Sequence, residues 1–284
     1  MPEVALPLEA IIRQATRRLG TAGIAEPRRE ALNLWSGLEG VSPGAAILAG
    51  ASSVSGDSAA RFEDGLERRV RGEPLAYVTG WAGFRRLVLR ADRRALIPRP
   101  ETEGLVELVL ERVRTGRVAD IGTGTGCIGL SLLQEGRYQQ VIGVERSRPA
   151  LDLARENRER SGLPLALAAG DCCEPLGDGQ LDAVLANPPY VARSEYEGLD
   201  SSVRDWEPPE ALVSGEDGLE VTRQLLAEAG RPLRPDGLLA LEVDAGRGAQ
   251  VARMAAEMGW NRVTLLNDLF GRARYLLAQR SKDA

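Results

Sequence analysis

Hydrophobic residues in the first 74 positions recur at the three- and four-residue spacing of amphipathic helices. Leu6–Leu19, Glu30–Leu38 and Ala59–Val70 each show this spacing and predict helices. Gly50–Asp57, which is rich in serine and glycine, predicts a loop before the third of them. Residues 1–74 therefore predict a small all-α domain whose length is marginal for folding alone.

The pattern changes at residue 75. Two short apolar runs, Leu75–Val78 and Leu87–Leu89, lie on either side of Gly80 and Gly83. Short apolar runs separated by turn residues are typical of a hairpin. Residues 75–98 therefore predict a β-hairpin linker, or a short extended one, between two domains.

Residues 99–284 alternate between helices and short apolar strands. After a helix at Gly104–Val113, the expected strands are Arg117–Ile121, Gln140–Val144, Leu165–Ala168, Leu181–Ala186 and Gly237–Val243, and the expected helices are Cys127–Gln134, Pro149–Arg160, Gly218–Ala229 and Ala249–Met258. This alternation predicts an α/β domain with a parallel sheet covered on both faces. The final strands, Arg262–Leu266 and Arg274–Leu277, have no helix between them and should pair antiparallel.

The amino-acid composition narrows the set of possible catalytic groups. The 284 residues include no histidine, and the formal net charge is −5. The one lysine is Lys282, and the cysteines are Cys127, Cys172 and Cys173. No metal site is expected, and catalysis by histidine or a Schiff-base lysine is excluded. The odd cysteine count without a Cys-x-x-Cys pair suits a reducing compartment.

The charge and the hydropathy also bear on the cellular setting. The segment Met1–Ala5 has neither the basic nor the apolar part of a signal peptide, and no apolar run approaches the length of a membrane span. Negative net charge argues against gripping duplex phosphates over a broad basic face. We expect a cytoplasmic protein with no membrane contact and no stable binding of nucleic acid.

A glycine-rich loop follows the first strand of the α/β domain. It reads Asp120-Ile121-Gly122-Thr123-Gly124-Thr125-Gly126-Cys127 and opens a helix, which is the setting of a nucleotide-binding turn. Glycines there allow a tight turn and let a ligand approach the backbone. The carboxylate of Asp120 suits a cationic ligand better than a pyrophosphate.

Three more polar residues follow the next strands. Glu145 ends the second strand, 21 residues after Gly124, where an acid can accept hydrogen bonds from both hydroxyls of a ribose. Asp171 and Cys172 follow the third strand, where they could contact the amine and the ring of an adenine. The acid at Glu145 fits the ribose of NAD and that of S-adenosylmethionine equally well.

The sequence Asn187-Pro188-Pro189-Tyr190 directly follows the strand Leu181–Ala186. The two prolines fix the backbone and remove two donors. The side-chain oxygen of Asn187 and the carbonyl of Pro188 are then rigid acceptors that can take both hydrogens of an –NH2 group. Tyr190 can stack on a planar substrate and face a sulfonium. This loop favours methyl transfer to an amino or amide nitrogen.

Four further motifs extend the similarity to a known family. They are Ile97-Pro98-Arg99-Pro100-Glu101-Thr102-Glu103, Pro74-Leu75-Ala76-Tyr77-Val78-Thr79-Gly80, Gly215-Glu216-Asp217-Gly218-Leu219 and Asp268-Leu269-Phe270-Gly271-Arg272. Together with the Asn-Pro-Pro-Tyr loop, they resemble the bacterial HemK/PrmC family of release factor N5-glutamine methyltransferases. The resemblance by motif runs from about residue 70 to the end of the chain.

This resemblance implies a class I methyltransferase fold, a Rossmann-like seven-stranded sheet, preceded by a small N-terminal all-α domain. It implies S-adenosyl-L-methionine as methyl donor and the glutamine of the Gly-Gly-Gln motif in class I release factors as acceptor. The implied cofactor-binding residues are Asp120, Gly122, Thr123, Gly124, Thr125, Gly126, Glu145, Asp171, Cys172, Asn187, Arg99, Glu101 and Thr102. The implied substrate-binding residues are Asn187, Pro188, Pro189 and Tyr190, with Asn187, Pro188 and Tyr190 in catalysis. The N-terminal domain would dock the release factor, and a monomer is expected.

Three positions depart from the family pattern. Glu145 stands where aspartate is usual, Cys172 replaces a bulkier residue, and Glu242–Gly248 differs from a shorter Glu-Ile-Gly segment. Three other functions are alternatives to release factor methylation. An adenine N6 DNA or RNA methyltransferase would use the same Asn-Pro-Pro-Tyr loop on a flipped base. A nicotinamide-dependent oxidoreductase would leave that loop unexplained, and a non-catalytic binding module would not need Asn187.

Overall fold

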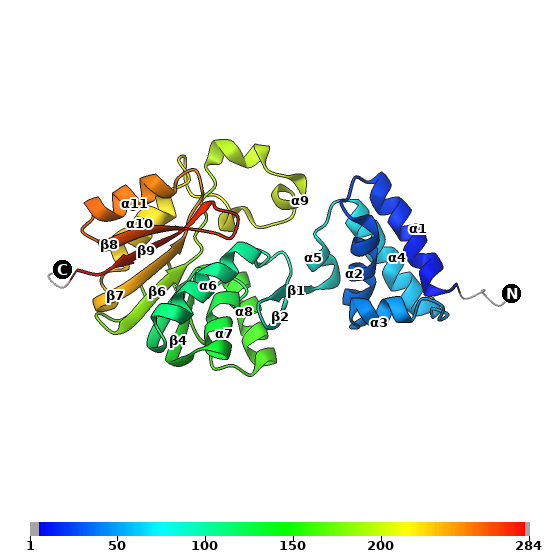
Figure 1. The fold of residues 1–284 in the computed structure, drawn as a ribbon, viewed down its shortest axis with the longest axis horizontal. Helices are drawn as coiled ribbons and strands as arrows, with labels where there is room; N and C mark the ends of the chain where they lie inside the picture. Colours follow the sequence, from blue (N-terminus) through cyan, green and yellow to red (C-terminus); the bar gives the residue numbers. More distant parts are fainter. Residues whose placement is uncertain (1–5, 282–284) are drawn as a thin grey trace. The chain divides into compact units, whose positions relative to one another are not determined.

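The computed structural model describes residues 6–281 and divides the chain into two compact units (Figure 1). One unit comprises Met1–Trp81 together with Asp200–Trp206, and the other comprises Ala82–Leu199 and Glu207–Ala284. The segment Met1–Ala5 and Lys282, both used above, lie outside the described residues.

The first unit is helical. Its helices are α1 (Leu8–Thr21), α2 (Pro27–Glu39), α3 (Pro43–Leu48), α4 (Gly56–Val70), α5 (Leu75–Thr79) and α9 (Ser201–Arg204). The three longest correspond to the predicted helices. Their apolar faces form one core in which Ile12, Leu34 and Phe62 are almost fully buried. The rings of Trp35 and Phe62 meet edge to face, with centroids 5.5 Å apart.

Two local predictions for this part of the chain were wrong or incomplete. Leu75–Val78 was expected to be extended, but it forms α5, because Pro74 starts the turn and Gly80, at φ 80°, ends it. The short helix α3 was not predicted; it begins at Ser42, whose hydroxyl accepts a hydrogen bond from the amide of Ala45 at 3.2 Å.

The hairpin of the linker is shorter than predicted. Its strands are β1 (Trp81–Phe84) and β2 (Leu87–Arg90). Arg85 turns the chain between them at φ 50°, and its side chain donates to Glu135 at 2.7 Å. The backbone amide of Arg85 donates to Glu103 at 2.9 Å, so this contact within the second unit fixes the turn.

The second unit contains a seven-stranded sheet in the order β5-β4-β3-β6-β7-β9-β8. Its strands are β3 (Thr115–Ile121), β4 (Arg137–Glu145), β5 (Ala166–Ala169), β6 (Leu181–Ala186), β7 (Leu233–Glu242), β8 (Asn261–Asn267) and β9 (Ala273–Gln279). The first five are parallel, and β9 runs antiparallel to both β7 and β8. The predicted α/β class, the parallel sheet and the antiparallel final pair are confirmed.

Helices cover both faces of this sheet (Figure 1). They are α6 (Pro100–Arg112), α7 (Cys127–Glu135), α8 (Arg148–Ser161), α10 (Glu220–Glu228) and α11 (Gly248–Glu257), with the short 3-10 turns η1 (Arg193–Gly198) and η2 (Pro209–Ala211) nearby in the chain. Successive strand residues enter opposite cores: Val118 packs with the α6 and α7 side, and Ala119 with the α10 and α11 side. Over residues 6–281, no helix combines the length and apolarity needed to cross a bilayer.

Candidate active site

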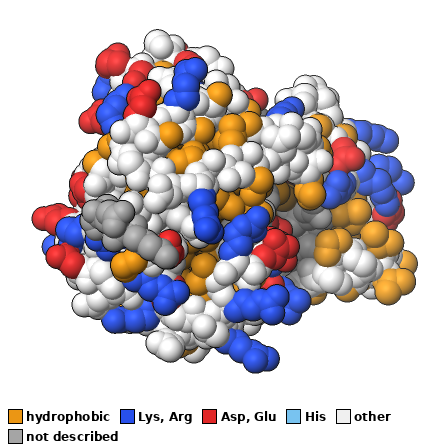
Figure 2. All heavy atoms as spheres, turned by 60° about the vertical axis from the view of Figure 1, so that its left-hand side comes forward, with side chains coloured by type: hydrophobic (Ala, Val, Ile, Leu, Met, Phe, Trp, Pro, Cys, Tyr) orange, Lys and Arg blue, Asp and Glu red, His pale blue; other side chains and the backbone are white. Residues whose placement is uncertain are grey.

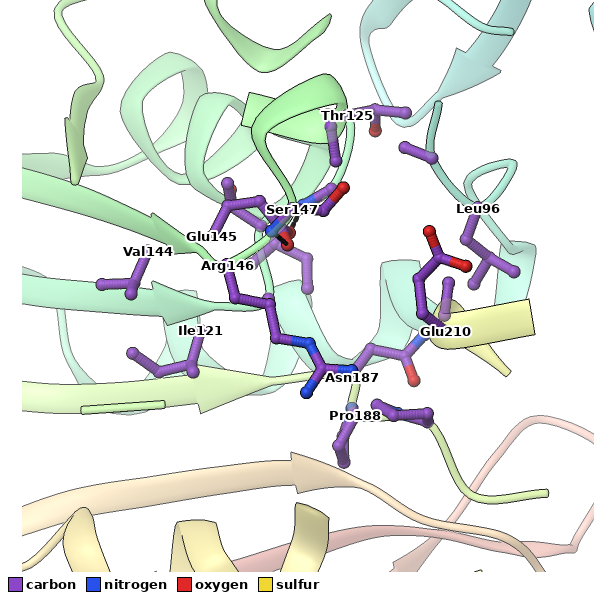
Figure 3. Close-up of a pocket in the computed structure, with 18 of the residues that line it drawn as sticks. Leu96, Ile121, Thr125, Val144, Glu145, Arg146, Ser147, Asn187, Pro188 and Glu210 are labelled. Carbon is purple, nitrogen blue, oxygen red and sulfur yellow. Dashed lines mark hydrogen bonds between the residues drawn. The ribbon is translucent and has the colours of Figure 1, made fainter. Parts of the chain in front are cut away.

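A cavity opens at the carboxyl ends of the central parallel strands, where ligands bind in open α/β sheets (Figure 3). Its empty volume is about 1050 Å³ with the open mouth included. Most of the sequence-predicted residues line it: Arg99, Thr102, Gly122, Thr123, Gly124, Thr125, Glu145, Asp171, Cys172, Asn187, Pro188 and Pro189. Asp120, Gly126, Glu101 and Tyr190 are not on its wall.

The glycine-rich loop forms one wall of this cavity. The amides of Gly122 and Thr123 donate to the carbonyl of Val144 at 2.9 and 3.0 Å, which ties the loop to the next strand. Gly122 and Gly124 have φ values of 68° and 54°, in the left-handed region that favours glycine. A Cβ placed on Gly122 would meet no atom within 4 Å. That space is available to a ligand.

Asp120 lies beneath the loop, not in the cavity. Its Oδ2 accepts hydrogen bonds from the Thr123 hydroxyl at 2.6 Å and the Gly129 amide at 3.1 Å. Its Oδ1 is buried without a hydrogen-bond partner. Burial raises the pKa of this carboxyl to about 6. The expectation that Asp120 faces a cationic ligand is therefore corrected, because its side chain holds the loop and the start of α7 together.

Glu145 stands on the cavity wall with its carboxylate already oriented. One oxygen accepts from the amide of Gly124 at 3.0 Å and the other from the amide of Ser147 at 2.9 Å. The side chain is largely buried, and each carboxylate oxygen has further lone pairs. The arrangement fits two adjacent hydroxyl donors. It also shows that the glutamate is long enough to support the loop from the neighbouring strand.

Asp171 and Cys172 lie on the same wall. Cys172 has φ 43°, an uncommon conformation for a residue with a side chain, next to a cavity. Burial raises the pKa of its thiol to about 12, so the group is a neutral and unreactive surface at physiological pH. A neutral sulfur can pack against an apolar or aromatic ligand ring.

The Asn187-Pro188-Pro189 stretch forms the opposite side of the cavity. The Nδ2 of Asn187 donates to the Thr102 hydroxyl oxygen at 3.0 Å. Its Oδ1 is consequently left as an acceptor for a ligand. Tyr190 is not part of the cavity wall, and burial raises the pKa of its phenol to about 12. Its hydroxyl therefore stays protonated over the physiological range.

The segment 97–102 is positioned by residues far away in the chain. Glu207, almost fully buried, accepts from the amide of Ile97 at 3.1 Å and from the guanidinium of Arg99 at 2.5 Å. The carbonyl of Glu101 accepts from the hydroxyl of Tyr275 at 2.7 Å. The Arg99 side chain is thus engaged by Glu207, and Glu101 contributes its backbone to the support of the site.

Sequence reasoning missed several polar residues of the site. Arg146 and Glu210 point into the cavity (Figure 3). Arg146 could have been found, because it directly follows Glu145 at a strand end. Glu210 lies in η2, a segment without periodicity, and Glu207 and Glu242 act through partners more than a hundred residues away. Among residues 6–281, no group of three or more acidic, histidine or cysteine side chains could hold a metal.

Known proteins and families match this chain over nearly its whole length. Residues 101–200 match the family model "Methyltransferase small domain", and residues 10–80 match the model "PrmC N-terminal domain". A "Release factor glutamine methyltransferase" of Deinococcus radiodurans is 39% identical over 282 residues, covering 97% of this chain and 99% of its own length. One of Streptomyces coelicolor is 38% identical, with 96% and 98% covered. A methyltransferase structure from Pyrococcus furiosus has a TM-score of 0.53 at 20% identity, covering 68% and 88% of the two chains, and supports the fold.

The α/β sheet, with a glycine-rich loop and a cavity at its carboxyl edge, defines a methyltransferase with a Rossmann-like fold. More narrowly, the chain belongs to the release factor glutamine methyltransferase family. The family identified from the sequence motifs is confirmed, and so are the enzyme class and the fold with its N-terminal helical region.

Proposed function

We propose that this enzyme transfers a methyl group from S-adenosyl-L-methionine to the side-chain amide nitrogen of the glutamine in the Gly-Gly-Gln motif of class I release factors. The named activity of the near full-length relatives supports the substrate. The observation that carries the proposal for this site is the amide of Asn187, whose Nδ2 is held by Thr102 while its Oδ1 remains an acceptor at the cavity.

The cavity wall fits this methyl donor. The loop from Gly122 to Gly126 would hold the methionine moiety, since a Cβ on Gly122 would meet no atom within 4 Å and the space beside this part of the backbone is open. Glu145 would accept hydrogen bonds from the ribose hydroxyls, and Asp171 and Cys172 would flank the adenine. Bound there, the donor supplies an electrophilic methyl group on a sulfonium.

The chain's own residues act mainly by position. Asn187 Oδ1 and the carbonyl of Pro188 would accept both hydrogens of the glutamine amide and stabilise the positive charge that develops on its nitrogen. An amide nitrogen that becomes positive loses its proton readily, so no strong base is needed before attack. This agrees with a sequence that contains no histidine. Orientation of the amide in the cavity then accounts for most of the rate.

We further propose that three segments of the chain have different roles. Residues 1–74 would dock the release factor, residues 75–98 would link, and residues 99–284 would catalyse. Two exposed hydrophobic residues of α3, Ile47 and Leu48, have relative exposures of 57% and 89% and offer an apolar contact. The double variant I47S/L48S should then raise the KM for release factor and leave the affinity for methyl donor unchanged. An unchanged KM would remove α3 from the docking surface.

Cellular setting and assembly belong to the same proposal. We expect a cytoplasmic monomer, because release factors act in the cytoplasm, and no stable contact with nucleic acid. On the face in Figure 2, arginine side chains lie among acidic ones. Several arginines of residues 6–281 are paired, such as Arg85 with Glu135 and Arg94 with Glu156, each at 2.7 Å. Paired arginines offer little net attraction to phosphates.

The direct test is methylation of an unmodified class I release factor. The purified enzyme would be incubated with S-adenosyl-L-methionine and release factor, and the Gly-Gly-Gln peptide would be examined by mass spectrometry. We expect one added methyl on the glutamine, absent with N187A. A parallel reaction with adenine-containing DNA and RNA should give no product. Methylated nucleic acid with an unmodified release factor would reverse the substrate assignment.

A further inference from the structure

Three side chains from different parts of the fold meet at the first residue of the Asn-Pro-Pro-Tyr loop. Asn187 follows β6, Glu242 ends β7, and Thr102 lies in the first turn of α6. In the sheet, Ala186 pairs with Leu241, so the residues that follow them, Asn187 and Glu242, lie at neighbouring strand ends. The sheet register thus brings these two side chains to the same place.

Their hydrogen bonds have a defined direction. The Thr102 hydroxyl donates to Glu242 Oε2 at 2.7 Å, and Asn187 Nδ2 donates to the same hydroxyl oxygen at 3.0 Å. A hydroxyl has one hydrogen, and an ionised carboxylate can only accept. Once Thr102 has given its hydrogen to Glu242, it can only accept from Asn187. The Asn187 atom next to Thr102 must then be the nitrogen, and the oxygen must be on the other side.

Glu242 is a buried carboxylate, like Asp120 and Glu207 in the same unit. It is 1% exposed, and Thr102 is 2% exposed, so the hydrogen bond between these two side chains is shielded from water. Burying a carboxylate is costly unless hydrogen bonds and nearby charges compensate. Arg274 and Arg99 act favourably on the charged form of Glu242, and Glu101 acts against it. Buried groups with shifted pKa values cluster at functional sites.

We propose that Glu242 is a positioning residue that acts through Thr102 to hold the Asn187 amide with Oδ1 facing the substrate. This inference rests on the proposed function, in which that oxygen accepts a hydrogen bond from the glutamine amide. It assigns a role to the start of the Glu242–Gly248 segment, which departs from the family pattern, and to Thr102 beyond the lining of the cofactor site.

The first test uses variants that change the direction of the hydrogen bonds while preserving volume. Glu242→Gln can donate to Thr102, which frees the hydroxyl to donate to Asn187 Oδ1 and turns the amide around. We expect kcat to fall about tenfold or more, the size of one misdirected hydrogen bond. The kcat of T102V, whose side chain cannot accept a hydrogen bond from Nδ2, should fall by a similar factor. T102S keeps the hydroxyl and should retain most of the wild-type kcat. The affinity for S-adenosyl-L-methionine, measured by calorimetry, should change by less than about threefold for E242Q.

A double-mutant cycle separates positioning from a merely structural role. If Glu242 acts only through Asn187, E242Q should have no further effect on kcat in an N187A background. Additive losses in the double variant would overturn the proposal. So would E242Q or T102V with wild-type kcat. An inactive wild-type enzyme would instead overturn the proposed function, so the two failures are distinguishable.

The pH profile gives a second readout. Burial raises the pKa of Glu242 to about 7, and the direction of the hydrogen bonds is enforced only by the ionised form. The other charged groups acting on it are Arg274, Arg99 and Glu101. The charge of Glu242 also acts on the phenols of Tyr190 and Tyr275 and on the thiol of Cys127. Burial raises the pKa of each to about 12, so all three are neutral near pH 7.

We therefore expect kcat of the wild type to rise as pH increases through about 7, and that of E242Q to stay flat over the same range. The side-chain amide resonance of Asn187, assigned by its loss in N187A, should titrate over the same range in the wild type. The titration is recorded on the wild-type protein, and only the assignment of the resonance depends on a folded N187A variant. A resonance that does not move with pH would overturn the proposal.

Discussion

Gly104 faces the ring of Tyr275 at a distance that leaves no room for a side chain. A Cβ on Gly104 would lie 2.2 Å from the Tyr275 hydroxyl oxygen and 2.8 Å from Cζ. The same hydroxyl donates to the Glu101 carbonyl at 2.7 Å, which fixes the first turn of α6. Glycine is therefore required at position 104 for space rather than for backbone freedom. The contact fixes Thr102, which lies in the same turn.

Substitution of Gly104 by alanine should destabilise the protein. Tyr275 is buried and cannot swing away, so the added methyl must push α6 off β9. Overpacking costs roughly 1–3 kcal/mol, and the better helix propensity of alanine returns only about 1 kcal/mol. We expect a net loss of about 1 kcal/mol in the free energy of unfolding, measured by urea denaturation, together with a lower kcat. The matched control is G44A in α3, where a Cβ meets nothing within 4 Å and the change should be neutral or stabilising. Equal effects of the two substitutions would contradict this account.

Replacement of Asn187 by alanine removes the acceptor proposed to hold the substrate amide. Loss of one preorganised polar contact lowers turnover by roughly 10²–10³. We expect kcat to fall by that factor in a methylation assay, with the dissociation constant for S-adenosyl-L-methionine nearly unchanged in calorimetry. N187D keeps an acceptor but loses the donor to Thr102, so its kcat should lie between those of the wild type and N187A. Near-normal turnover by N187A would exclude the assigned role.

Removal of the Glu145 carboxylate should weaken binding of the methyl donor. Glu145 accepts from Gly124 and Ser147 and would also accept from the ribose, so E145A disturbs both the loop and the ligand. Hydrogen bonds to charged groups contribute about 1.5–3 kcal/mol, which predicts a dissociation constant roughly ten- to hundredfold higher. The control is D152A, an exposed residue of α8 that pairs with Arg155. If E145A and D152A bind the donor equally well, the ribose assignment is wrong.

Stability should depend on the protonation of Asp120. Its pKa is about 6 in the folded protein, above the ordinary 3.8, so the folded state holds this proton more tightly than the unfolded state. The stability that it contributes is present below about pH 4 and is lost as pH rises through about 6. D120N has no such titration. The unfolding free energy of D120N relative to the wild type should therefore rise by about 1–3 kcal/mol between pH 4 and pH 7, measured by denaturation at each pH. A difference that is constant with pH would show that Asp120 does not titrate in this way.

The sequence predicted those parts of the site that depend on local order. Gly122, Gly124, Glu145 and Asn187 each follow a recognisable strand, and parallel strands bring their carboxyl ends to one edge. The antiparallel pairing of β8 and β9 followed from the missing helix between them. These inferences needed only periodicity and the position of turn residues.

The parts that sequence could not supply depend on distant partners. Glu207 meets Arg99, and Glu242 meets Thr102 across 140 positions, and no local pattern reports such pairs. Asp120 was assigned to the ligand because its position at a strand end does not reveal which way the side chain points. Leu75–Val78 is apolar enough for a strand, but Pro74 and Gly80 favour one helical turn. In each case tertiary contacts or turn residues determined the structure that formed.

The grouping of Asp200–Trp206 with the N-terminal helices has a consequence for dissecting this enzyme. The backbone passes between the two units at three points, after Trp81, Leu199 and Trp206, so no single cut separates them. Removing the N-terminal residues would strip away the surface on which this segment packs, including the position of Gly72, where a Cβ would lie 3.8 Å from the Trp206 indole nitrogen. The residue next in the chain is Glu207, which anchors Ile97 and Arg99 beside the cavity. The helical unit is therefore formed by two separate segments of the chain. We expect removal of the N-terminal residues to disturb the contacts of Glu207 beside the cavity as well as the helical unit itself.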